Sequence, residues 1–131
     1  MSIELALIEA RKAAKKGEVP IGAVIVRDGK VVARAHNMRE KKQNALYHAE
    51  VLAIMRACKK LKSWRLSDCE MYVSLQPCPM CMGAITNARL RKVYYGAETN
   101  SDLNWTTEYV DLKNSECSKL LKDFFATKRD T

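Results

Sequence analysis

The sequence has no long apolar run: no stretch approaches the roughly 20 consecutive apolar residues that a membrane-spanning helix needs. Residues 1–16 also lack the uninterrupted apolar core of a secretory signal peptide, because Glu4, Glu9, Arg11 and Lys12 stand among their apolar positions. Internal repeats, low-complexity segments and linkers are missing as well. We therefore expect a cytoplasmic protein without a membrane partner.

The composition is poor in the residues that dominate collagen-like or disordered chains. Only 5 of the 131 residues are glycine and 3 are proline, whereas 47% are hydrophobic and 29% are charged. A chain of this length has room for one domain and buries roughly two-thirds of the surface that its unfolded form exposes. We expect a single domain that covers residues 1–131.

Basic residues exceed acidic ones. The sequence holds 23 Lys and Arg against 15 Asp and Glu, which gives a formal net charge of +8. This excess favours an anionic partner such as nucleic acid, although many basic proteins bind none.

Apolar and polar residues alternate in a way that predicts an α/β protein. Helices are expected at 2–16, 48–61, 79–88 and from an N-cap at Ser115, and strands at 21–26, 31–36, 71–75, 92–96 and 108–110. Asp28-Gly29 predicts a hairpin between the first two strands, and residues 37–44 are expected to form a loop. The order predicts a three-layer α/β/α fold, with a mixed central sheet of about five strands flanked by helices.

One constellation carries chemistry: His48-Ala49-Glu50, followed by Pro77-Cys78 and then Cys81. One histidine and two cysteines can hold zinc and leave its fourth position open for water, which is typical of catalytic zinc. A Cys-x-x-Cys pair alone could equally be a redox pair or half of a zinc ribbon, and His-x-Glu alone carries little information. The ordered combination is specific.

The local spacing supports a shared metal site. Cys78 is expected at an N-cap with Pro79 in the first helical position, so both sulfurs lie near a helix N-terminus that favours the thiolate form. Glu50 could then carry protons from an activated water to a leaving group.

These motifs resemble those of the cytidine-deaminase-like zinc deaminases, whose signature is this same H-x-E…P-C-x-x-C pattern. The closest resemblance is to the tRNA-specific adenosine deaminases, and it extends over most of the chain. The matching segments are residues 18–24, 36–37, 48–50, 72–81, 93–97, 116–117 and 121–125.

The resemblance implies a zinc hydrolase of the EC 3.5.4 class that converts adenosine to inosine at the tRNA wobble position or in related single-stranded nucleic acid. His48, Cys78 and Cys81 would hold one Zn²⁺ per chain, zinc-bound hydroxide would attack C6 of adenine, and Glu50 would be the proton shuttle. The family resemblance also implies a homodimer.

The same resemblance assigns substrate contacts to Asn37, Ile21, the backbone N–H of Ala49, and Phe124. Each has a purely structural alternative: Asn37 as a turn residue, Ile21 as core, and Phe124 as a packing residue of the last helix.

The sequence departs from the family pattern at two places. Gln76 stands where glutamate usually precedes Pro-Cys, and the segment 97–114 is shorter than the family's. Since that segment borders the substrate pocket, a free nucleobase or nucleoside deaminase acting on guanine, cytosine or cytidine is the alternative function. A non-catalytic zinc-binding module is a third possibility, which the presence of Glu50 disfavours.

Overall fold

The computed structural model describes residues 2–99 and 107–129. These residues form the following elements in chain order: α1 (Ser2–Lys15), β1 (Gly22–Arg27), β2 (Lys30–His36), α2 (Arg39–Lys42), α3 (Ala49–Leu61), β3 (Glu70–Leu75), α4 (Pro79–Ala88), β4 (Lys92–Ala97), β5 (Glu108–Asp111) and α5 (Ser115–Arg129). Among the described helices, none has the length and apolar character that crossing a membrane requires.

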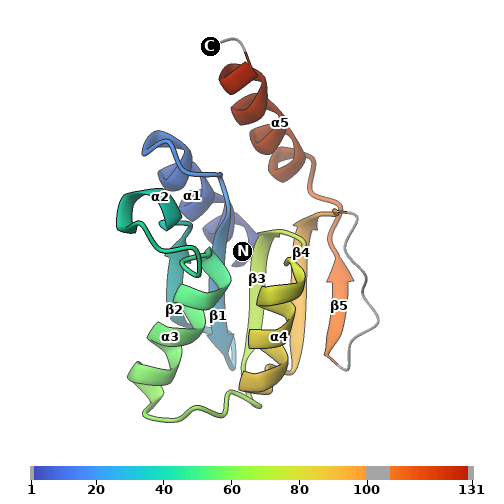
Figure 1. Cartoon of the computed structure of the whole chain (residues 1–131). Helices are drawn as coiled ribbons and strands as arrows, with labels where there is room; N and C mark the ends of the chain where they lie inside the picture. Colours follow the sequence, from blue (N-terminus) through green and yellow to red (C-terminus); the bar gives the residue numbers. More distant parts are fainter. Residues whose placement is uncertain (1, 100–106, 130–131) are drawn as a thin grey trace.

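The strands form one mixed sheet in the order β2-β1-β3-β4-β5. Strand β1 is antiparallel to β2 and β3, whereas β3, β4 and β5 run parallel. Helices α3 and α4 cover one face, and α1 and the first turns of α5 contact the other (Figure 1). The structure therefore confirms the three-layer α/β/α fold and the mixed five-stranded sheet.

The hairpin between β1 and β2 follows the sequence prediction. Asp28 and Gly29 both have positive φ angles, 51° and 75°, and Arg27 pairs with Lys30 across the turn. Two consecutive positive φ angles suit the right-handed twist of a two-residue hairpin, which is why Asp-Gly is favoured there.

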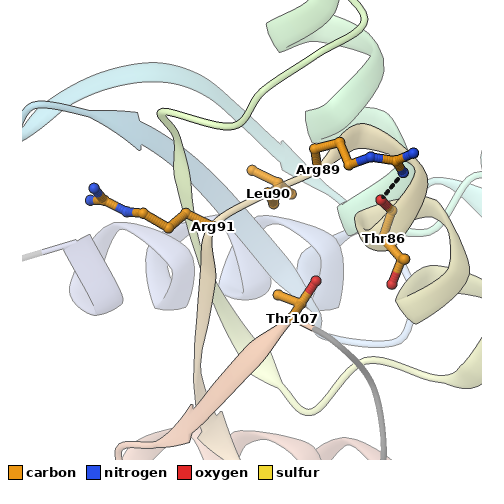
Figure 2. A pocket seen from close by; sticks show the side chains of 5 residues that line it. All are labelled: Thr86, Arg89, Leu90, Arg91 and Thr107. Atoms are coloured by element: carbon orange, nitrogen blue, oxygen red, sulfur yellow. Dashed lines mark hydrogen bonds between the residues drawn. The ribbon is translucent and has the colours of Figure 1, made fainter.

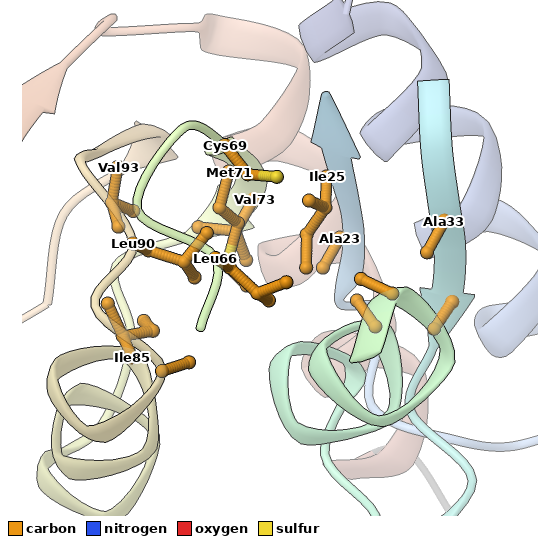
Figure 3. Close-up of a cluster of buried hydrophobic side chains, with 14 of the residues drawn as sticks. Ala23, Ile25, Ala33, Leu66, Cys69, Met71, Val73, Ile85, Leu90 and Val93 are labelled. Atoms are coloured by element: carbon orange, nitrogen blue, oxygen red, sulfur yellow. The ribbon is translucent and has the colours of Figure 1, made fainter. Parts of the chain in front are cut away.

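The main core lies between the sheet and the α3–α4 layer. Figure 3 shows strand residues Ile25, Met71 and Val73 meeting Leu66 and Ile85, and these side chains are fully buried. On the opposite face Val24 packs against α1, so both faces of β1 are covered. This explains why its sequence is a continuous apolar run and does not alternate with polar residues.

Helix α1 approaches β1 closely at Gly22. A Cβ atom there would overlap the carbonyl oxygen of Ala6 and lie 2.5 Å from the backbone nitrogen of Ala10. Glycine is therefore required for this contact between helix and sheet.

Two local expectations were wrong. The expected loop contains the short helix α2, because the Glu18 carboxylate accepts hydrogen bonds from the backbone N–H groups of Glu40 and Lys41. The last helix is capped by Asn114, whose Oδ1 accepts a hydrogen bond from Cys117 N–H at 3.1 Å, and Ser115 is already helical. Of the segment 97–114, which we expected to be short, residues 100–106 lie outside the described part of the chain.

Candidate active site

Two helices begin at the edge of the sheet where β3 ends, and their first residues form the site (Figure 1). His48 is the N-cap of α3 and Cys78 is the N-cap of α4. Pro79 occupies the first turn of α4, and Cys81 follows within that turn. The local geometry expected from the sequence is thus present, and it brings the three side chains together from two separate elements.

We call His48, Cys78 and Cys81 the metal-ligand group. The Sγ atoms of Cys78 and Cys81 lie 3.8 and 3.5 Å from His48 Nδ1, and the three ligand atoms are all within 4.8 Å of one another. Tetrahedral zinc, with bonds of about 2.0–2.3 Å, sets nitrogen and sulfur ligands about 3.5 Å apart. The spacing and the donor set therefore fit a zinc ion.

The electrostatics of the group favour a cation. Burial raises the pKa of the Cys81 thiol, and the nearby Glu50 and Cys78 raise it further. Burial also lowers the pKa of His48, as does the positive charge of Arg39, so the imidazole is neutral and can act as a ligand. For Cys81, burial therefore outweighs the helix N-terminus that was expected to favour the thiolate, and a bound divalent cation would favour that thiolate again.

Glu50 is almost completely buried beside Cys81. Its side chain is 2% exposed, and its Oε1 atom has no hydrogen-bond partner among the described residues. Burial raises the pKa of Glu50 to about 7, although a backbone hydrogen bond opposes the shift. A carboxyl group with this pKa can both accept and donate a proton near neutral pH.

The structure describes all four residues that were expected to contact substrate, and each has a different setting. Ala49 is the first residue of α3, directly after His48 of the metal-ligand group. Asn37 is buried, and its backbone N–H donates a hydrogen bond to the carbonyl oxygen of Ile21 at 3.1 Å, so these two residues adjoin each other. Phe124 lies on α5 with its ring edge-on to Phe125. The roles of all four residues with substrate remain predictions.

Two residues that no sequence motif marks also act electrostatically on, or respond to, this site. The positive charge of Arg39 on α2 contributes to the lowered pKa of His48. Tyr109 on β5 has a buried hydroxyl without a hydrogen-bond partner in the described structure, and burial raises its pKa, assisted by the charges of Cys81 and Glu50. Strand β5 reads Glu-Tyr-Val-Asp, without apolar–polar alternation, so no sequence signal marked Tyr109.

A separate pocket of about 420 Å³ lies at the opposite end of α4 (Figure 2). Arg89 Nη1 in its wall donates to the carbonyl oxygen of Thr86 at 2.9 Å, and Arg91 Nη2 donates to Glu70 at 2.9 Å. Both guanidinium groups are thus already partnered, and the pocket is distinct from the metal-ligand group.

The sequence matches the MafB19-like deaminase family over residues 1–129. The tRNA-specific adenosine deaminase of Bacillus subtilis is 55% identical over 92 residues, which cover 70% of this chain and 57% of that protein. The tRNA-specific adenosine deaminase of Agrobacterium fabrum is 40% identical over 142 residues, covering 97% of this chain and 93% of that protein.

A solved structure from work on A-to-I editing by tRNA:A34 deaminases at the wobble position of transfer RNA shares the fold. It has a TM-score of 0.86 and 38% sequence identity, and the match covers 92% of this chain and 98% of that one. The chain therefore belongs to the MafB19-like deaminases and to the same family as the tRNA-specific adenosine deaminases.

Proposed function

We propose that this chain is a single deaminase domain that hydrolyses adenosine to inosine at the wobble position of tRNA. The observation that carries the proposal is the metal-ligand group beside the buried Oε1 of Glu50, which finds no hydrogen-bond partner in the described part of the chain. The similarity to tRNA-specific adenosine deaminases over nearly the full chain supports the choice of substrate.

The residues of the site divide the chemistry between them. A zinc ion bound by His48, Cys78 and Cys81 would supply Lewis-acid activation of water. Glu50 takes a proton from the attacking water and passes it to N1 of adenine, and then moves the second proton of that water to the amino nitrogen, which leaves as ammonia. Asn37, Ile21, Ala49 and Phe124 would hold the base, which must leave its stack to reach the site.

The surface beside the site suits RNA. Helix α2 carries Arg39, Lys41 and Lys42, and the net charge of the chain is +8. Phosphate contacts by such residues predict that RNA binding weakens steeply as salt concentration rises. A tRNA substrate also fits the expected cytoplasmic location.

A homodimer remains our expectation for the assembly. Three large apolar side chains on or just before α3 and α4 are exposed: Leu46, Met55 and Met80. Exposed apolar surface of this kind favours association between subunits. Light scattering on the purified protein tests it, and a monomeric mass at micromolar concentration would contradict it.

The substrate is tested by incubating the zinc-loaded protein separately with a tRNA pool, free adenosine, guanine, cytosine and cytidine, followed by mass spectrometry. We expect inosine in tRNA and no product from the free compounds. Xanthine, uracil or uridine with unchanged tRNA would support the alternative of a nucleobase or nucleoside deaminase.

A further inference from the structure

Glu18 lies in the turn before β1 and is 1% exposed. Its Oε1 and Oε2 accept hydrogen bonds from the backbone N–H groups of Glu40 and Lys41, at 3.0 and 2.7 Å. A buried carboxylate is unfavourable unless its oxygens are hydrogen-bonded, so both bonds contribute to the folded state. The partners lie 22 and 23 residues further along the chain.

The bonds to Glu18 hold residues 40 and 41 of the segment 37–42. Two backbone hydrogen bonds hold its first two residues. Asn37 N–H donates to Ile21 at 3.1 Å, and Met38 N–H donates to the carbonyl oxygen of Tyr47 at 3.0 Å. Tyr47 directly precedes the ligand His48. The four-residue helix α2 is too short to be stable by itself, so these contacts determine where it lies.

We propose that Glu18 is a positioning residue that holds the segment 37–42 beside the metal-ligand group, so that Asn37 and Arg39 are kept in place for RNA. The inference rests on the proposed function and adds to it a residue outside the catalytic motifs. Two backbone donors require two acceptors, which a carboxylate provides. A glutamine would provide one acceptor and turn an N–H₂ donor toward the second N–H.

The test compares Glu18→Gln with Glu70→Gln, the same chemical change at a residue that pairs with Arg91 far from the segment. Hydrogen exchange followed by mass spectrometry should show the amides of 39–42 exchanging at least about tenfold faster in Glu18→Gln, with the rest of the chain unchanged. The KM for an anticodon stem-loop RNA should rise about tenfold, with a smaller change in kcat and one zinc retained per chain. Glu70→Gln should show neither effect.

A purely structural role gives a different result. Partial unfolding would speed exchange throughout the chain and lower kcat while KM stayed constant, because fewer molecules would be active. That pattern, or unchanged exchange at 39–42, would overturn the proposal. If the unmodified protein deaminates no RNA, the proposed function fails, and the exchange data alone still decide whether Glu18 holds the segment. If Glu18→Gln does not fold, Glu18→Asp is measured in its place by hydrogen exchange and by kinetics. This variant keeps the carboxylate but shortens the side chain by one methylene.

Discussion

The sulfur of Cys81 lies 3.5 Å from Nδ1 of His48, although 33 residues separate them in the chain. The contact exists because α3 and α4 begin at the same edge of the sheet. A pair of ligands fixed in this way needs little reorganisation to take up a metal ion.

Replacing Cys81 should therefore abolish metal binding. Cys81→Ala leaves only two of the three ligands, so we expect zinc to fall well below one ion per chain when measured by inductively coupled plasma mass spectrometry. Cys58→Ala, a cysteine outside the metal-ligand group, is the control and should keep its zinc. Stoichiometric zinc in Cys81→Ala would show that the ligands are different.

The close packing of α1 on β1 predicts that adding a single methyl group at Gly22 lowers the stability of the protein strongly. Gly22→Ala places a methyl group against the backbone of Ala6 and Ala10, and we expect it to lower the free energy of unfolding by about 1–3 kcal/mol or more. Gly83→Ala in α4 meets no atom within 4 Å and should stabilise the protein by up to about 1 kcal/mol through helix propensity. Urea unfolding measures both, and equal effects would contradict the close approach at Gly22.

A buried carboxylate makes stability depend on pH. Burial raises the pKa of Glu9, but hydrogen bonds from His36 and Lys12 and the charges of Lys12 and Arg34 outweigh it, so the pKa lies below the ordinary value of 4.5. A lowered pKa in the folded state stabilises the protein above the unfolded value, and that stability is lost as pH falls through the folded one.

The measurement is urea unfolding of the unmodified protein and of Glu9→Gln between pH 7 and pH 2. The unmodified protein should lose stability more steeply than Glu9→Gln as pH falls below about 4.5, since the variant has no carboxyl group to protonate there. Parallel curves would contradict a stabilising role for the ionised Glu9.

Local patterns predicted most of the fold and indicated that His48, Cys78 and Cys81 lie together, whereas their role as metal ligands stays a prediction. Asp28-Gly29 specified the hairpin through backbone conformation alone, and Pro79 marked the start of α4. What the sequence could not predict depends on distant partners. Helix α2 forms because Glu18 reaches across 22 residues, and Tyr109 lies near the site only because β5 pairs with β4. The cap of α5 was misplaced by one residue because both Asn114 and Ser115 are good N-caps.

The most direct test of the account is inosine formation in an anticodon stem-loop RNA by the zinc-loaded protein and by Glu50→Ala. We expect the unmodified protein to convert the wobble adenosine and to leave free adenosine unchanged. Glu50→Ala should keep one zinc per chain and its fold but lose turnover by about 10²- to 10⁴-fold. Normal turnover by Glu50→Ala would contradict the proton-shuttle role, and an unconverted RNA with the unmodified protein would contradict the proposed function.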